Sequence, residues 1–252
     1  MAITHRAARA VLAATAATSA TLALTATSAQ AWTTYKPTGG PAVSFVNQGA
    51  IKIDFPLGGF TLDCTSFTLG GTVSSPGTSR AYAAPTGSTG PAAASMGTTS
   101  SGCSHPVWSS TVTPQGTWKL ALTGDPVVVP SATGTTGLRA VAEYPAKIYD
   151  IRAYVDVAGC TFYVGGAADT ATTTTGTGWV SGTFDPLTQV FKAKATSAGL
   201  VVATVPSGPM CTVLDYFYED DPVAIIGATT GSAALWKNMP PAGSTSLLVG
   251  HP

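Results

Sequence analysis

The sequence predicts an all-β protein, an antiparallel β-sandwich or β-barrel held together by two disulfides. Apolar and polar residues alternate with a period of two along much of the chain, which is typical of strands with one buried face. After the first thirty-one residues, no segment combines a helical apolar face with a capping residue. The chain contains four cysteines, an even number that favours disulfides in an exported protein.

Residues 1–31 have the pattern of a Sec-type signal peptide. Arg6 and Arg9 make the start positive, residues 10–26 are uncharged, and small residues end in an A-x-A pattern at Ala31. The apolar run is too short and too rich in Thr to span about 30 Å of hydrocarbon. We therefore expect cleavage near Ala31, secretion, and no transmembrane helix.

The charge balance argues against nucleic acid as a partner. Two of the twelve basic side chains lie in the leader, so ten basic and twelve acidic side chains remain, a net charge of −2. Binding to a nucleic acid depends on cationic side chains that neutralise phosphates. We expect no nucleic-acid partner.

The four cysteines predict the bridges Cys64–Cys103 and Cys160–Cys211 among three possible connectivities, because each pair lies within one half of the chain. Each bridge closes a loop of roughly 40 to 50 residues, which the chain-entropy model values near 4 kcal/mol. The cysteines are scattered without a C-x-x-C pair, which disfavours a zinc site.

Alternation predicts the strands in order. In "IKIDF", Ile51, Ile53 and Phe55 share one face, and in "TWKLAL" Trp118 lies on the apolar face. "YDIRAYVDV" and "CTFYV" form a predicted hairpin with its turn at Ala158-Gly159, and Asp150, Arg152 and Asp156 lie on the polar face of its first strand. Further strands are expected at residues 43–47, 60–64, 66–73, 179–184, 189–195, 199–205, 211–218 and 223–228.

Segments rich in Gly, Pro, Ser and Thr interrupt the strands. Residues 74–102 are predicted to form a long surface loop that Cys103 ties back, and residues 170–178 a second exposed connection. The predicted organisation is a signal peptide (1–31), one all-β domain (32–235) with two loosely similar halves (about 42–145 and 146–230), and a C-terminal tail (236–252).

Several of these patterns together resemble a group of uncharacterised, small, exported, β-rich actinobacterial proteins with two disulfides. The patterns are "F-x-L-x-C" at Phe60–Cys64, "W-K-L" at Trp118–Leu120, a "G-C-x-F-x-V-x-G" strand at Gly159–Gly165, a Gly-rich hairpin at Gly182–Phe191, and Cys211 before the acidic turn of Asp220 and Asp221. The resemblance implies secretion, β structure and disulfides, and it implies no reaction.

The stretch "DYFYEDDP" concentrates acidic residues in a chain with few charges. Asp215, Glu219, Asp220 and Asp221 are four of the twelve carboxylates. A solvated turn between two strands explains them most simply, because Asp tolerates turn geometry. A calcium site built on Glu219, Asp220 and Asp221 is the alternative, and a catalytic carboxylate pair is a weaker one.

Aromatic residues in the same stretch predict a binding surface. Tyr216 and Tyr218, with Asp220 and Asp221, form the candidate binding residues, since exposed tyrosines can stack on sugar rings. No catalytic motif is present: G-x-S-x-G, S-x-x-K, H-E-x-x-H and the P-loop are all missing. His105 is expected to be a loop imidazole, and we predict no catalytic residue and no cofactor.

These observations predict a secreted, non-enzymatic β protein with a binding or structural role outside the cell or at its envelope. Its surface loops, 74–102 and 168–178, are the expected contact regions, and a cell-envelope glycan or protein is the expected kind of partner. Two alternatives stay open: a carbohydrate-binding or carbohydrate-acting module, and a membrane-active, pore-forming β assembly.

Overall fold

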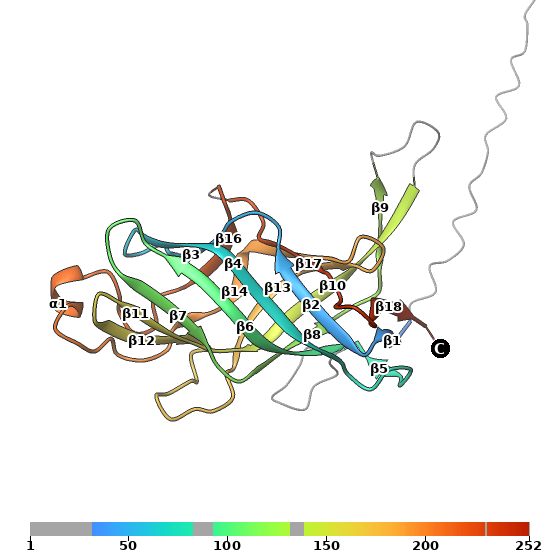
Figure 1. Cartoon of the computed structure of the whole chain (residues 1–252), viewed down its shortest axis with the longest axis horizontal. Helices are drawn as coiled ribbons and strands as arrows, with labels where there is room; N and C mark the ends of the chain where they lie inside the picture. The colour runs from blue at the N-terminus through green and yellow to red at the C-terminus, as the bar shows by residue number, and fades with distance from the viewer. Residues whose placement is uncertain (1–31, 83–92, 132–138, 230, 252) are drawn as a thin grey trace, which may run out of the picture. The chain divides into compact units, whose positions relative to one another are not determined.

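The computed structural model describes residues 32–82, 93–131, 139–229 and 231–251, so the predicted signal peptide lies outside the described residues. Nearly all of the regular structure is strand, with one helical turn (Figure 1). The elements are β1 (Thr34–Gly40), β2 (Ala42–Asn47), β3 (Ile51–Phe55), β4 (Phe60–Val73), β5 (Arg80–Ala81), β6 (Ala94–Ser104), β7 (Ser110–Pro114), β8 (Thr117–Leu122), β9 (Val127–Ser131), β10 (Arg139–Ile151), β11 (Ala153–Val157), β12 (Cys160–Gly165), β13 (Gly178–Asp185), β14 (Val190–Gly199), β15 (Val201–Val202), α1 (Cys211–Leu214), β16 (Ala224–Gly227), β17 (Leu235–Asn238) and β18 (Thr245–Gly250).

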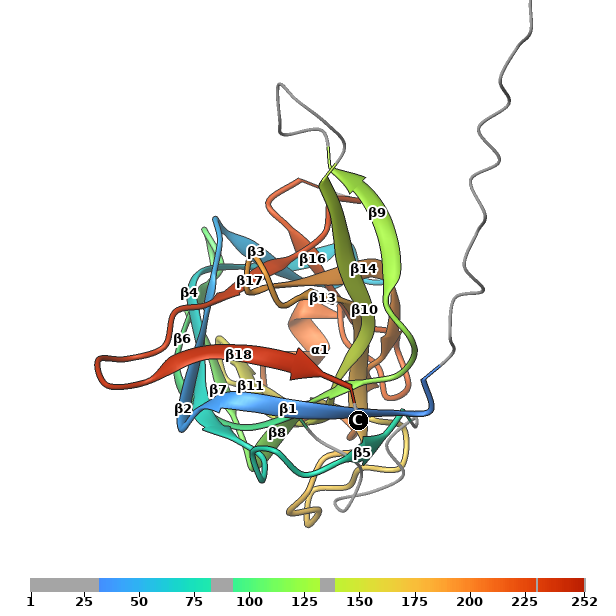
Figure 2. The same ribbon diagram turned by 90° about the vertical axis from the view of Figure 1, so that its right-hand side faces the viewer.

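An eight-stranded antiparallel barrel forms the centre of the domain. Its strands follow the order β4-β2-β17-β14-β13-β10-β8-β6, and the ring closes because β6 pairs with β4 as well as with β8. Figure 2 looks toward this ring, with β1, β18 and β5 crossing in front of it. The all-β prediction is confirmed, and the barrel is the architecture that the central sheet adopts.

A second layer packs beyond one end of the barrel. The first part of β4 leaves the ring and pairs with β3, which pairs with β16. A separate sheet, β15-β12-β11-β7, lies against this extension, and the rings of Phe55 on β3 and Phe162 on β12 are 5.7 Å apart. The core therefore runs continuously from the barrel into a small sandwich.

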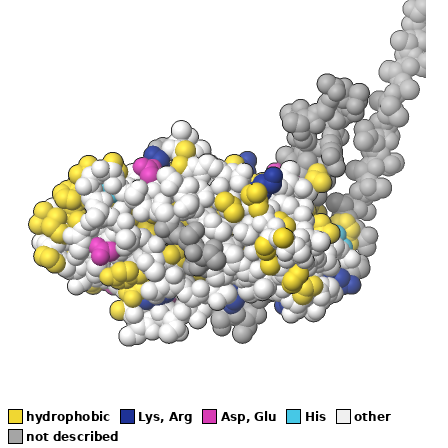
Figure 3. All heavy atoms as spheres, in the orientation of Figure 1, with side chains coloured by type: hydrophobic (Ala, Val, Ile, Leu, Met, Phe, Trp, Pro, Cys, Tyr) yellow, Lys and Arg dark blue, Asp and Glu magenta, His cyan; other side chains and the backbone are white. Residues whose placement is uncertain are grey.

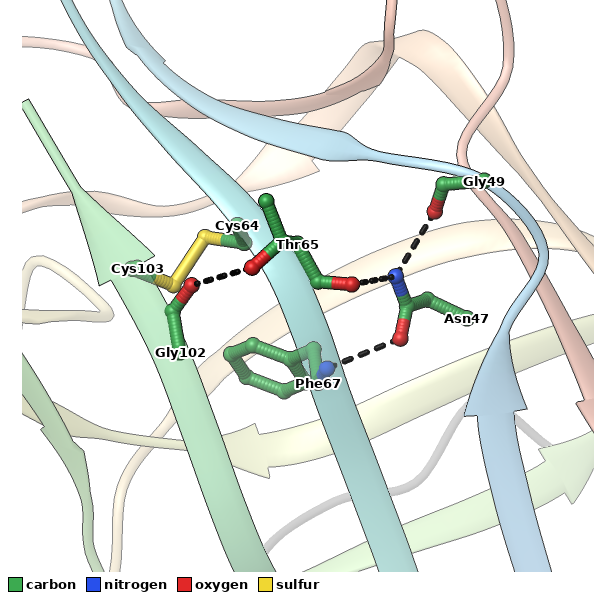
Figure 4. Close-up of a disulfide and its surroundings, with 7 residues drawn as sticks. All are labelled: Asn47, Gly49, Cys64, Thr65, Phe67, Gly102 and Cys103. Carbon is green, nitrogen blue, oxygen red and sulfur yellow. Dashed lines mark hydrogen bonds between the residues drawn. A yellow bond between two sulfur atoms is a disulfide. The ribbon is translucent and has the colours of Figure 1, made fainter.

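The first disulfide lies at an irregularity in the β4–β6 ladder (Figure 4). Cys64 pairs with Cys103 across β4 and β6, and the ladder shifts register immediately after Cys64. The Asn47 side chain satisfies the backbone there: its Oδ1 accepts the Phe67 amide at 2.8 Å, and its Nδ2 donates to the carbonyls of Gly49 and Thr65 at 2.7 and 3.2 Å. This side chain supplies the partners that an irregular buried ladder would otherwise lack.

Both predicted disulfides are confirmed, Cys64–Cys103 and Cys160–Cys211. The second joins β12 to α1.

The prediction of a surface loop at 74–102 is wrong for its last part, which is a strand. Residues 83–92 lie outside the described residues, but Ala94–Ser104 form β6 and close the barrel. The alternation pattern missed this strand because its residues are mostly small and polar. The facing strand β4 approaches it closely at one glycine. A Cβ on Gly71 of β4 would lie 1.9 Å from the Ser95 carbonyl oxygen.

The predicted domain limits also need correction. Residues 236–252 do not form a tail outside the domain, because β17 is a barrel strand and β18 pairs with β1. Trp236 on β17 is 2% exposed and its ring packs near Phe67 and Phe191. The expected boundary between the halves, at 145/146, falls inside β10.

Candidate binding site at the α1 end

The acidic stretch begins after a helical turn, so the strand predicted at 211–218 is wrong. Cys211 starts α1 and is bonded to Cys160 of β12. The buried Leu214 ends the turn, and Asp215 follows with a left-handed backbone (φ 51°) while its amide donates to the Cys211 carbonyl at 3.0 Å. The bridge and this cap redirect the chain before it can continue as a strand.

The carboxylates of this stretch are used to build a turn. The hydroxyl of Tyr218 donates to Asp215 Oδ1, and the Tyr218 amide donates to Asp221 Oδ2 at 3.0 Å. The backbone then joins β15: the Asp220 amide donates to the Val202 carbonyl, and the Val202 amide donates to the Asp221 carbonyl, both at 2.9 Å. The arrangement therefore fixes the ring of Tyr218 from both ends.

The hydrogen bond to Asp215 is the main reason that the pKa of the Tyr218 phenol lies above its usual value. A neutral phenol can donate to the carboxylate, whereas a phenolate would be repelled by it.

The structure does not support the alternative of a calcium site at Glu219, Asp220 and Asp221. Among the described residues, no group of three or more His, Cys, Asp or Glu side chains is arranged to hold a metal ion. Glu219 and Asp220 are exposed, and the Asp221 carboxylate accepts the Tyr218 amide. The structure does not bring Glu219, Asp220 and Asp221 together as a ligand set.

Tyr216 lies over a buried aromatic stack. Its ring centroid is 5.5 Å from that of Phe60, and the His105 ring is also stacked on Phe60, with centroids 4.4 Å apart and planes within 13°. The turn between β3 and β4 approaches the same residue, since a Cβ on Gly58 would lie 2.1 Å from the Tyr216 carbonyl oxygen. Tyr216 and Tyr218 therefore belong to one end of the domain, together with segments distant in sequence.

His105 organises the loop between β6 and β7. Its Nδ1 accepts the amides of Val107 and Trp108, both at 3.2 Å. With one ring nitrogen accepting from the backbone and one ring face on Phe60, His105 has a structural part in this loop.

Exposed apolar side chains gather at this end of the domain. We name the apical patch as the following residues, with their exposed fractions: Leu57 (71%), Val107 (74%), Val213 (68%), Tyr216 (36%) and Tyr218 (55%). They come from the β3–β4 turn, the β6–β7 loop, α1 and the segment after it. Figure 3 shows hydrophobic side chains concentrated at the α1 end of the visible face. Sequence alternation missed the patch because its members lie in turns, where no periodic pattern exists.

A set of charged side chains that alternation placed on the surface is buried in the structure. Asp150 and Arg152 were expected on a polar face, yet they are 4% and 1% exposed. Lys119 Nζ lies 2.8 Å from Asp150 Oδ2, and the Arg152 guanidinium lies 3.8 Å from the centroid of the Tyr163 ring. Burial raises the pKa of Asp150 above its usual value, although the Lys119 ammonium opposes the shift. The break between β10 and β11 turns these side chains inward.

No family model, curated protein or solved structure matches this chain. The likeness to small exported actinobacterial proteins is therefore one of sequence pattern. Among the described residues, no helix is long and apolar enough to cross a bilayer.

Proposed function

We propose that the protein is a secreted, non-enzymatic binding protein that contacts an extracellular or cell-envelope protein through the apical patch. The leader sequence supports export, and the two disulfides suit an oxidising compartment. Exposed loops presented on a rigid β scaffold commonly carry binding function.

The exposure of the apical patch is the observation that carries this proposal. Burying one Leu or Val side chain stabilises a complex by about 1.5–3 kcal/mol, so Leu57, Val107 and Val213 together are a substantial driving force. Scattered single apolar residues are ordinary on protein surfaces, but a cluster rimmed by polar groups indicates an interaction site.

The rim indicates the chemistry of the partner. Asp215, Glu219 and Asp220 are exposed beside the patch. An apolar centre with a charged rim is the usual composition of a protein–protein interface. We therefore expect a partner with an apolar pocket bordered by Lys or Arg.

The experiment measures retention of the labelled, disulfide-bonded protein on the cell-surface fraction of its source organism. Val213→Asp and Leu57→Asp should each reduce retention at least about tenfold, because both place an unpaired charge in the buried centre. Leu187→Asp is the matched control, since Leu187 is 55% exposed in the turn between β13 and β14. Equal retention of all three variants would contradict the proposal.

A glycan is the second candidate ligand, favoured by the fixed ring of Tyr218. The ring is 55% exposed and is held by Asp215 and Asp221, so it could stack on a sugar whose hydroxyls donate to the carboxylates. Sedimentation with insoluble polysaccharides tests this: Tyr218→Ala should abolish binding, whereas Tyr154→Ala on β11 should not. If the wild-type protein stays in the supernatant with every polysaccharide, the glycan candidate is wrong.

A further inference from the structure

Three lysines that are separated in the sequence lie on one face of the neighbouring barrel strands β14 and β17. Lys192 and Lys194 are two residues apart on β14, so both point to the same face, and both are exposed. Lys237 on β17 is exposed and lies opposite Val190, which places it diagonally from Lys192 on that face. Three ammonium groups therefore share one surface of two neighbouring strands.

Among the residues that the structure describes, no ion pair neutralises these ammonium groups. Within the described ranges, the salt bridges join Lys52 to Asp63 and Lys119 to Asp150, and no carboxylate lies within 4 Å of Lys192, Lys194 or Lys237. Lys147 on β10, which β13 separates from β14, is engaged differently, since its Nζ lies 3.5 Å from the Trp179 ring centroid. The three lysines thus leave a local positive field on a domain whose residues 32–252 carry a net charge of −2.

A cleft of about 260 Å³ opens beside two of these lysines. Its lining residues are Glu143, Thr183, Lys192, Ala193, Lys194, Ala195, Gly231 and Ala233. Thr183 lies directly opposite Lys192 in the β13–β14 ladder, so a hydroxyl donor adjoins the ammonium groups. Alanine and glycine leave the floor free of bulky side chains.

We propose that this cleft binds a phosphate group, held by Lys192 and Lys194, with Thr183 as a hydroxyl donor. Lysine binds phosphate as a point charge, and two lysines about 7 Å apart along a strand can approach one phosphate from two sides. Glu143 in the wall repels negative charge at its side of the cleft, so we expect the phosphate to lie on the side of the two lysines. The inference is independent of the function proposed for the apical patch.

The test titrates the disulfide-bonded protein with pyrophosphate and, separately, with long-chain inorganic polyphosphate at low salt. Lys192→Gln/Lys194→Gln should weaken binding at least about tenfold, because each ammonium contributes about a fivefold effect at contact distance in water. Lys36→Gln/Lys52→Gln is the matched control, because it changes the net charge equally on β1 and β3. Glu143→Gln should strengthen binding.

The two probes distinguish the source of the phosphate. Similar affinity per phosphate for both indicates a free phosphate-bearing molecule, whereas a strong preference for polyphosphate indicates a polymer. The proposal is overturned if the wild-type protein binds neither probe, or if the control pair weakens binding as much as the cleft pair does.

Discussion

Removing each disulfide in turn tests whether the Cys160–Cys211 bridge fixes the segment that carries the apical patch, with the Cys64–Cys103 bridge as the comparison. Cys160→Ser/Cys211→Ser opens a bridge between residues 51 apart, and Cys64→Ser/Cys103→Ser opens one between residues 39 apart. The chain-entropy model assigns about 4 kcal/mol to loops of either length. We therefore expect both double variants to lose a similar free energy of unfolding, within about 1 kcal/mol of each other.

The local consequences of the two changes should differ. β4 and β6 stay joined without their disulfide, because their ladder runs from Asp63↔Ser104 to Val73↔Ala94. In the described structure, the backbone hydrogen bonds of residues 209–219 reach no farther along the chain than Gly208 and Asp221. Once the bridge to β12 is gone, α1 is retained by side-chain packing, chiefly of the buried Leu214 and Phe217 and of the Tyr216 ring on Phe60.

Urea unfolding followed by Trp fluorescence gives the global stability, and amide hydrogen exchange gives the local stability of residues 209–219. Removal of Cys160–Cys211 should accelerate exchange in this segment and abolish binding by the apical patch under native conditions. Removal of Cys64–Cys103 should leave both unchanged. Unaltered exchange in the first variant, or loss of binding in the second, would refute the reasoning.

Three further predictions concern single side chains. Asn47→Ala should lower the free energy of unfolding, measured in urea, by about 2–3 kcal/mol, because it leaves buried backbone groups unpaired. The neighbouring control Gln48→Ala should change it by less than about 0.5 kcal/mol, and equal effects would contradict the reasoning. The fold raises the pKa of Asp150, so the stability that its protonated form contributes is fully present at pH values below its ordinary pKa of 3.8 and is lost as the pH rises through the folded pKa. The stability of the wild type relative to Asp150→Asn should therefore fall with rising pH. A difference that does not depend on pH would contradict this. Asp215→Asn should lower the pKa of the Tyr218 phenol, which NMR titration of labelled tyrosine measures, and no change would show that Asp215 does not hold that proton.

Alternation and cysteine spacing predicted much of the fold from local information. Strands such as Ile51–Phe55 and Cys160–Gly165 are recognisable because every second residue is buried. The failures share a cause. β6 lacks apolar alternation and is a strand because it pairs with β4 and β8, and α1 replaces a strand where Cys211 is tied to β12. Both depend on a partner that is distant in sequence.

The candidate site also consists of residues that the sequence singled out and residues that only the structure revealed. The sequence singled out Tyr216, Tyr218 and the acidic residues around them, since an acidic aromatic run is visible without any partner. It did not reveal that Tyr216 rests on Phe60 or that Leu57 and Val107 belong to the same surface. Turns have no periodicity, so only the folded chain brings their tips together.

The amino-acid sequence by itself determined that this protein is built from strands, because burial on alternate residues is a property of neighbours along the chain, and the spacing of the cysteines favoured the two disulfides that the structure contains. Only the tertiary structure decided that the central sheet closes into a barrel, that Asp150 and Arg152 turn inward, and that Lys192, Lys194 and Lys237 share one wall. The physical reason is that closure, burial of charge and the local electric field are set by pairings between strands far apart in the sequence, and a net charge near zero conceals how the charges are distributed.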